Sequence, residues 1–135
     1  VENSYNSPDD INALDWNRRR EFSSDVNWVQ ELIRIRKQHD AFRLGDASAI
    51  RQHVSFLNTP KSVIGYCLSN VLAYDPWKNI IVFFNQGLME EKVVLPEGPW
   101  KIALDHCKVY KNGYPTIEDN AINVPKLSVL ILFQT

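Results

Sequence analysis

The pattern of apolar and polar positions changes character around the middle of the chain, from one helical pattern to a series of short apolar runs. The most apolar run extends from Ile80 to Phe84 and lies between Asn79 and Asn85. Consecutive β-branched and aromatic residues between turn-forming residues are typical of a strand that is buried on both faces. We therefore predict that this strand is the centre of a sheet and that other segments cover both of its faces.

Further short strands are predicted at regular spacing on both sides of this run. They fall near residues 54–57, 63–68, 91–95, 100–104 and 127–133, with shorter pieces at 108–110 and 121–124. Between two of them, residues 96–99 (PEGP) form a predicted turn, because proline restricts φ and glycine permits positive φ. About seven short antiparallel strands with turn residues between them predict a β-sandwich.

One amphipathic helix is predicted before the strands, over residues 26–39. Val26, Val29 and Ile33 recur at helical spacing, and Leu32 widens the apolar face. Basic residues occupy the last turns, where positive charge suits the helix dipole. Nothing helical of comparable length precedes this element, so its apolar face must pack on the strands or on a part of a larger protein.

Residues that typically cap or end helices are found at both ends of this helical region. Ser24 and Asp25 precede the apolar pattern and are residue types that cap helix N-termini. Gly45 is the expected stop after the helix, because glycine commonly ends helices. Asp46 is expected to cap one short further helical turn over residues 47–52.

The first 24 residues are polar and rich in turn-forming side chains. Asn, Ser and Asp side chains hydrogen-bond to nearby backbone and favour turns over regular structure. Tyr5, Leu14 and Trp16 are too large to be left in water, so we expect a shaped loop in which Trp16 packs against the helix. The run Arg18–Arg20 is expected to be a solvated surface. Shaped loops of this kind often bind polar ligands.

Composition limits the fold and the possible partners. The chain has 135 residues, 44% of them hydrophobic, which suits one compact domain with an appendage. Its 15 basic and 16 acidic residues give a net charge of −1, so we expect neither nucleic acid nor a membrane as a partner. No apolar segment approaches the roughly 20 residues of a membrane span, and we expect no signal peptide in the polar N-terminal residues.

The cysteines and histidines give no evidence of a metal site. Cys67 and Cys107 lie 40 positions apart without CxxC spacing, and we interpret them as two separate buried thiols. A disulfide or a metal site remains the alternative for this pair. His39, His53 and His106 lack ligand spacing and are expected at the surface or in packing roles. We therefore predict no metal and no cofactor.

A resemblance to a known family runs over essentially the whole chain. Residues 3–9 (NSYNSPD), Asn12 and residues 14–16 (LDW) resemble the segment after the last barrel strand of type I pullulanases, starch-debranching enzymes of glycoside hydrolase family 13. Residues 32–43 resemble the final barrel helix of that family, which usually ends in His-Pro-Ala-Phe-Arg. Asp40 stands here in place of the proline. Residues 77–82, 95–98 and Trp100 are similar to strand and turn signatures of the family's C-terminal domain.

The resemblance implies a fold class and a domain organisation. It implies a mainly β protein: an antiparallel β-sandwich of the α-amylase C-terminal type, preceded by a loop and one amphipathic helix left over from a (β/α)8 barrel. Residues 1–45 are then the end of the catalytic barrel, and residues 46–135 are the C-terminal β-sandwich domain. The implied partner is an upstream catalytic barrel of the same polypeptide.

The implied activity is hydrolysis of α-1,6 branch linkages in pullulan and starch-type glucans. Retaining glycosidases need two carboxyl groups about 5–5.5 Å apart across the scissile bond. In the family resembled, these carboxylates lie upstream of the matched segment, so we expect no catalytic residue in this chain. Asp9, Asp10 and Asp15 are not substitutes, because they lie in turn-forming surroundings and nothing apolar is arranged around one of them as an acid role requires.

The resemblance also implies a substrate site at the edge of the cleft, formed by Tyr5, Ser7, Asp9 and Asn12. Hydroxyl and carboxylate groups suit sugar hydroxyls, and aromatic faces suit sugar C–H surfaces. The alternative for Asp9 and Asn12 is a purely structural role in capping turns.

A second class of function is a free-standing β-sandwich that binds carbohydrate or another protein. It requires a row of solvent-facing Trp or Tyr residues, whereas Trp77 and Trp100 are expected in the core. An exposed apolar patch on the helical region would favour the first class, because such a patch marks a missing partner surface. The residues whose exposure would form such a patch are Trp28, Val29, Ile33 and Phe42.

Overall fold

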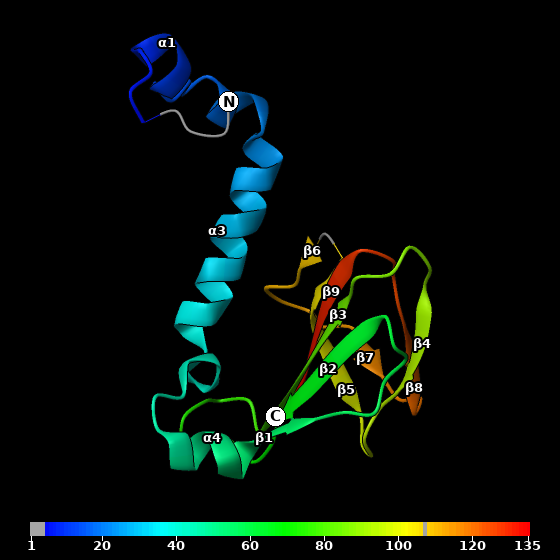
Figure 1. The fold of residues 1–135 in the computed structure, drawn as a ribbon. Coiled ribbons are helices and arrows are strands. Elements are labelled where there is room, and N and C mark those ends of the chain that lie inside the picture. Colours follow the sequence, from blue (N-terminus) through cyan, green and yellow to red (C-terminus); the bar gives the residue numbers. More distant parts are fainter. Residues whose placement is uncertain (1–4, 107) are drawn as a thin grey trace.

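A helical segment leads into a domain of antiparallel sheets in the computed structural model, which describes residues 5–106 and 108–135 (Figure 1). The helical elements are α1 (Asp9–Asn12), α2 (Arg18–Glu21), α3 (Ser23–Gln38), the 3-10 helix η1 (Asp40–Arg43) and α4 (Ala47–His53). The long helix α3 extends away from the sheets at its N-terminal end, where α1 and α2 lie (Figure 1). The predicted order of a helical region followed by strands is therefore confirmed.

The described residues form nine strands in two antiparallel sheets. They are β1 (Val54–Phe56), β2 (Val63–Leu68), β3 (Asn79–Asn85), β4 (Glu91–Val94), β5 (Trp100–Asp105), β6 (Lys108–Val109), β7 (Thr116–Ile117), β8 (Ala121–Val124) and β9 (Ser128–Gln134). The large sheet has the order β1-β2-β3-β9-β5-β6, with β7 also paired to β5, and β4 pairs with β8 in the small sheet. The predicted mainly β, antiparallel fold is confirmed, and β7 is the strand that the sequence pattern missed.

Strand β3 lies in the interior of the large sheet, between β2 and β9. The side chains from Ile80 to Phe83 are fully or almost fully buried, as predicted for a strand covered on both faces. Phe84 departs from the prediction, because 46% of its surface is exposed. The alternation of β3 sends Ile81 and Phe83 to one face and Ile80 and Val82 to the other.

The small sheet covers the first face of the large one. Val93 and Val124, from β4 and β8, are buried in the same apolar cluster as Ile81, Phe83 and Trp100. The indole Nε1 of Trp100 donates a hydrogen bond of 2.9 Å to the carbonyl of Pro96, which satisfies the polar group of this buried ring. The predicted turn after β4 is also confirmed, because Gly98 adopts φ +106°.

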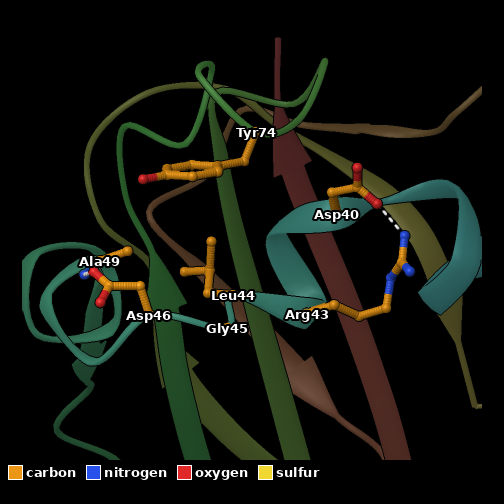
Figure 2. Close-up of a pocket in the computed structure, with 7 residues that line it drawn as sticks. All are labelled: Asp40, Arg43, Leu44, Gly45, Asp46, Ala49 and Tyr74. Carbon is orange, nitrogen blue, oxygen red and sulfur yellow. Dashed lines mark hydrogen bonds and ion pairs between the residues drawn. The ribbon is translucent and has the colours of Figure 1, made fainter.

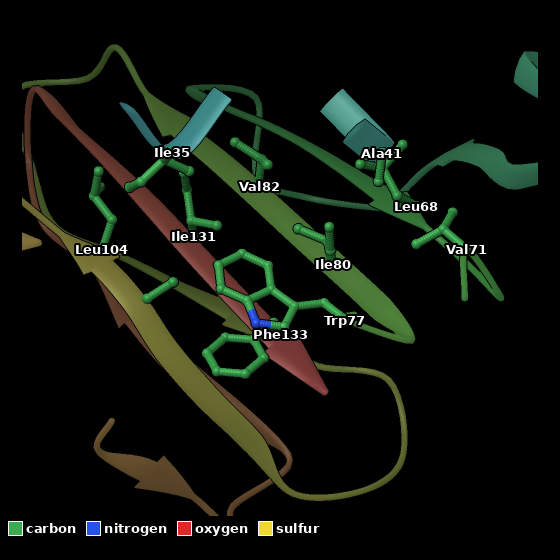
Figure 3. Close-up of a cluster of buried hydrophobic side chains, with 11 residues drawn as sticks. Ile35, Ala41, Leu68, Val71, Trp77, Ile80, Val82, Leu104, Ile131 and Phe133 are labelled. Atoms are coloured by element: carbon green, nitrogen blue, oxygen red, sulfur yellow. The ribbon is translucent and has the colours of Figure 1, made fainter. Parts of the chain in front are cut away.

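The helical segment covers part of the second face of the large sheet (Figure 3). Ile35 of α3 and Ala41 of η1 are buried in one cluster with Ile80 and Val82 of β3. Trp77 stacks on Phe133 of β9 at 4.1 Å between ring centroids, and Figure 3 shows the two rings side by side. Trp77 and Trp100 are thus core residues, as expected, and neither forms an exposed platform for sugar.

A buried carboxylate joins the helical segment to the large sheet. Asp75, in the loop before β3, has no exposed side-chain surface. Its Oδ1 accepts hydrogen bonds of 2.9 Å from His39 Nδ1 and from the backbone N–H of Trp77. Its Oδ2 accepts from the N–H of Ala41 at 3.4 Å. His39 also stacks on Trp77, so its expected packing role is confirmed.

The predicted N-terminal cap of α3 is wrong. The helix begins at Ser23, so Ser24 and Asp25 lie inside its first turn and neither side chain caps it. The reason is the preceding helix α2, which ends at Glu21. The chain enters α3 through Phe22, whose carbonyl accepts from the N–H groups of Asp25 and Val26 at 3.1 Å.

The C-terminal end of α3 also differs from the prediction. The helix ends at Gln38, before Gly45, because His39 is extended, with φ −118° and ψ 100°, and turns toward Asp75. Gly45 does not adopt positive φ and lies in the link between η1 and α4. The cap of α4 is confirmed, because Asp46 Oδ2 accepts from the N–H of Ala49 at 2.9 Å.

One ion pair ties the exposed part of α3 to the β-domain. Glu31 Oε1 lies 2.8 Å from Lys111 Nζ, and Glu31 also pairs with Arg34. The hydrogen bonds from Lys111 and Arg34 hold the pKa of Glu31 below its usual value. The contribution of Glu31 to stability is therefore present above its unfolded-state pKa and is lost as the pH falls through the lower folded-state pKa.

Replacing the distal partner tests this ion pair. In a Lys111→Met variant the pKa of Glu31 is expected to rise toward its usual value, because the largest cause of its depression is removed. NMR titration of the Glu31 carboxyl group measures this shift. Lys126→Met is the matched control, because Lys126 is exposed and lies in a turn before β9. An unchanged pKa of Glu31 in Lys111→Met contradicts the assigned pair.

The thiols and histidines are compatible with the expected absence of a metal site but do not test it. Cys67 is buried in the cluster beneath the small sheet, and burial raises the pKa of its thiol. Cys107 lies outside the described residues, so the expectation about its pairing stays a prediction. Within the described residues, no three His, Cys, Asp or Glu side chains are arranged to hold a metal ion. No helix among these residues is long and apolar enough to cross a membrane.

Candidate functional site

The loop predicted to bind substrate is built around the short helix α1. Pro8 precedes the helix, and its carbonyl accepts from the N–H groups of Ile11 and Asn12 at 3.0 and 3.2 Å. The carbonyl of Asp9 accepts from Ala13 N–H at 2.7 Å and closes the turn. These bonds arise between neighbours in sequence, so the loop has a defined shape without a core of its own.

The four predicted site residues lie together on this loop. Asn12 Nδ2 donates a hydrogen bond of 2.8 Å to the carbonyl of Ser7, which joins two of the four across the turn. This bond supports the structural role that was the alternative for Asn12. Asp9 is exposed in the first turn of α1, and 93% of the Tyr5 surface is exposed. The substrate-binding role of Tyr5, Ser7, Asp9 and Asn12 stays a prediction.

Large apolar side chains on the same segment are also exposed. The exposed fractions are 76% for Leu14 and 72% for Trp16. The predicted packing of Trp16 against the helix is therefore wrong. Figure 1 shows that the N-terminal segment lies at the end of α3 that is remote from the sheets. Among the described residues, neither apolar cluster includes a residue of this segment, so Trp16 has no core to pack against.

The exposed apolar surface continues along α3. Phe22, Val29 and Ile33 are exposed, whereas Trp28 and Phe42 are half-buried against the core of the large sheet. Of the four residues whose exposure would favour the first class of function, Val29 and Ile33 are exposed and Trp28 and Phe42 are not. Several large apolar side chains exposed on one segment are typical of an interaction surface. We call the exposed group Leu14, Trp16, Phe22, Val29 and Ile33 the apolar face.

The arginine run between these apolar residues behaves as expected. Arg18, Arg19 and Arg20 are exposed in α2, and the guanidinium of Arg18 lies 5.6 Å from the centroid of the Phe22 ring. The aspartates of this segment are also exposed, and the Asp15 side chain bonds only to nearby backbone among the described residues. Asp15 Oδ1 accepts from the N–H of Asn17 at 2.9 Å, which is an Asx turn. No described carboxyl pair of this segment is enclosed by apolar groups, so it lacks the environment of a catalytic acid.

A pocket of about 360 Å³ lies where the helical segment meets the β-domain, and the sequence analysis did not single it out. Figure 2 shows its lining residues, which come from η1, the link to α4, α4 itself and the loop before β3: Asp40, Arg43, Leu44, Gly45, Asp46, Ala49 and Tyr74. Asp40 and Arg43, three positions apart, are the lining residues whose pairing could have been predicted from the sequence. Tyr74 joins them only through the tertiary fold.

The fold and the loop define a mainly β domain with antiparallel sheets behind a helical segment, and known proteins contain the same arrangement. Residues 50–108 match the family model described as the pullulanase all-beta domain. The chain is 36% identical over 134 residues to a pullulanase of Bacillus subtilis (strain 168). The chain thus matches a C-terminal part of pullulanases.

Solved structures give the same result. The pullulanase from Bacillus acidopullulyticus superposes with a TM-score of 0.93 at 34% identity, covering 99% of this chain and 16% of that one. The type I pullulanase of Bacillus subtilis str. 168 complexed with maltose superposes with a TM-score of 0.92 at 34% identity, covering 100% of this chain and 19% of that one. The sequence match covers 98% of this chain, which spans only 18% of the length of the curated Bacillus subtilis relative.

Proposed function

We propose that this chain is the non-catalytic C-terminal region of a pullulanase-like glycoside hydrolase that cleaves α-1,6 linkages in pullulan and starch-type glucans. The observation that carries the proposal is the match of nearly the whole chain, at 36% identity, to a small part of a pullulanase. In this proposal residues 1–45 are the end of the catalytic barrel and residues 46–135 are the C-terminal β-sandwich domain.

The apolar face supports an upstream barrel as the partner. Its members lie on the N-terminal segment and on α3, outside the two apolar clusters of the β-domain. A helix needs a second apolar surface when apolar residues also lie outside the side that it buries against its own domain, as Val29 and Ile33 do in α3. A barrel of the same polypeptide supplies such a surface, and its contact would cover Trp16, Val29 and Ile33.

The loop around α1 is the proposed contact with α-glucan at the edge of the cleft. Tyr5 presents an aromatic face, Ser7 a hydroxyl, Asp9 a carboxylate and Asn12 an amide, which together suit a polyhydroxylated ligand. A structure of the Bacillus subtilis relative is complexed with maltose, an α-glucan unit. Because α1 is remote from the β-domain, the loop is free to border a cleft formed by another part of the protein (Figure 1).

Catalysis is assigned to residues outside this chain. Hydrolysis with retention requires two carboxyl groups about 5–5.5 Å apart that flank the bond, one of them kept protonated by its surroundings. Asp9, Asp10 and Asp15 are exposed in turns and short helices, where water solvates their charged forms. The chain alone is therefore expected to leave pullulan intact.

Grafting tests this assignment. The matching C-terminal part of the Bacillus subtilis pullulanase is replaced by this chain, and hydrolysis of pullulan is measured for the graft and for the 135-residue chain alone. We expect reducing sugar from the graft and no maltotriose from the chain alone. Hydrolysis by the chain alone, or an inactive but folded graft, contradicts the proposal.

Variants of the graft test the substrate loop. Asp9→Asn is expected to raise KM for pullulan by about threefold to tenfold with little change in kcat, because it weakens a contact remote from the reacting bond. Asp10→Asn is the matched control, because Asp10 is the neighbouring exposed carboxylate of the same helical turn. Equal effects of the two substitutions contradict the specific role of Asp9.

A further inference from the structure

We propose that the pocket between η1, α4 and the loop before β3 is a second α-glucan site that binds a short malto-oligosaccharide. We call it the junction pocket. The glucan class of the ligand rests on the proposed function, whereas the pocket and its chemistry rest on the structure. Its lining residues belong partly to η1 and α4, which lie at the opposite end of α3 from α1 (Figure 1), so the two sites are separate.

The junction pocket has the size and position of a ligand site. Its volume of about 360 Å³ falls within the range of roughly 300–1,000 Å³ that is usual for small-molecule sites. It lies where the helical segment joins the β-domain, and ligand sites favour such boundaries. The walls come from several elements, and the Asp75 hydrogen bonds to His39 and Ala41 hold η1 against the β-domain beside it.

Two side chains supply apolar surface for the C–H face of a sugar ring. Tyr74 is partly exposed, and the edge-to-face contact of its ring with His53, at 5.6 Å between centroids, orients it. Figure 2 shows the Tyr74 ring above Leu44. Exposed aromatic rings with a polar tip suit amphipathic ligands of this kind, because one face is apolar and the hydroxyl can hydrogen-bond.

Polar groups on both sides of these residues can bond sugar hydroxyls. On one side, Arg43 pairs with Asp40, and the same guanidinium nitrogen donates to the carbonyl of Lys37 at 3.2 Å. On the other side, Asp46 uses Oδ2 for the cap of α4, and its Oδ1 makes no hydrogen bond within the described part of the chain. Figure 2 shows Asp46 and the Asp40–Arg43 pair flanking Leu44.

The charges of the junction pocket favour a neutral ligand. One guanidinium and two carboxylates offer both donors and acceptors, as sugar hydroxyls require. An anionic ligand would meet the carboxylates of Asp40 and Asp46. The glycine at position 45 leaves open space, since a Cβ placed there meets nothing within 4 Å. A neutral polyhydroxylated chain fits these conditions better than a phosphate or a metal ion.

Binding of maltotetraose to the 135-residue chain tests the junction pocket, with isothermal titration calorimetry as the measurement. Tyr74→Ala is expected to weaken binding by about tenfold, because it removes the aromatic surface, and Tyr74→Phe by less than about threefold. Arg43→Gln is a second variant with an expected loss of about fivefold. The Arg43 side chain is exposed at the surface, so this substitution is expected to leave folding intact.

Leu72→Ala is the matched control, because Leu72 is exposed on the same loop as Tyr74 and does not line the junction pocket. An affinity unchanged in Leu72→Ala and reduced in Tyr74→Ala and Arg43→Gln supports the site. No binding of maltotetraose overturns it, as does binding that Tyr74→Ala and Arg43→Gln leave unchanged. Equal affinity for cellotetraose overturns the assignment to α-glucan.

The two proposals fail in different experiments. An inactive graft, or hydrolysis by the chain alone, overturns the proposed function whatever the calorimetry shows. If Tyr74→Ala does not weaken the binding of maltotetraose, the junction pocket is overturned, even when the graft is active. Asp9→Asn in the isolated chain separates the sites further, because binding at the junction pocket is expected to be unchanged by it.

Discussion

Replacing Phe83 with alanine is expected to destabilise the protein by about 3–5 kcal/mol, the range for deleting a large aromatic side chain from a packed core. Phe83 is fully buried in β3, in the cluster that joins the large and small sheets. Its ring also occupies the space above Gly65 of β2, where a Cβ would lie 2.7 Å from Phe83 Cε1. The cavity left by alanine therefore opens beside a residue that has no side chain to fill it.

Urea denaturation measures this effect, and the adjacent residue supplies the control. Phe84 has the same side chain on the same strand, but it faces the other side and is partly exposed. Phe84→Ala is expected to cost about 1 kcal/mol or less. If the two substitutions cost the same, β3 does not have the burial described for it.

Replacing Asp75 with alanine is expected to cost about 3–5 kcal/mol, because it leaves several buried donors without an acceptor. His39 Nδ1 and the N–H groups of Trp77 and Ala41 all lose their partner. Since these donors come from the end of α3, from η1 and from the loop before β3, the loss also loosens the helical segment from the sheet. Hydrogen exchange is expected to rise in the C-terminal turns of α3.

Two further variants test whether the cost of Asp75→Ala comes from the lost acceptors. Asp75→Asn keeps the shape and one acceptor oxygen, so a smaller cost of about 1–3 kcal/mol is expected. Asp119→Asn changes an exposed carboxylate in the turn before β8 and is expected to have an effect below about 0.5 kcal/mol. Equal urea midpoints for Asp75→Ala and Asp119→Asn contradict the role of Asp75 as the junction between the two parts.

The strands were predictable because their signals are local. The run Ile80–Phe83 is short, rich in β-branched residues and flanked by turn-forming residues, which together indicate an interior strand. The turn at Gly98 contains its own proline and glycine residues. Strand β7, Thr116–Ile117, was missed because two residues show no alternation. Its pairing with β5 depends on a sheet edge that the chain presents only after folding.

The ends of α3 were not predictable, because neighbouring elements decide them. Ser24 and Asp25 are good caps, yet α2 leads the chain into the helix before they are reached. His39 leaves the helix in order to reach the carboxylate of Asp75, which lies 36 residues away. Neither event has a signature within the helix itself.

The candidate sites also differ in whether the sequence could predict them. Tyr5, Ser7, Asp9 and Asn12 lie within one short segment, so the resemblance of that segment is enough to group them. The exposure of Trp16 was not predictable, because the sequence pattern shows that a side chain is apolar but not whether a partner surface is present. The junction pocket was missed because Tyr74 is distant in sequence from Asp40 and Arg43.

The amino-acid sequence by itself determined the order of the elements, the interior position of β3 and the resemblance to a C-terminal part of pullulanases. Hydrophobic periodicity, turn residues and short motifs act over a few positions and can be interpreted without a fold. Only the tertiary structure decided where α3 ends, which apolar residues remain exposed, and which polar groups meet at Asp75 and in the junction pocket. Those outcomes depend on contacts between segments far apart in the chain, which compete with local preference and often override it.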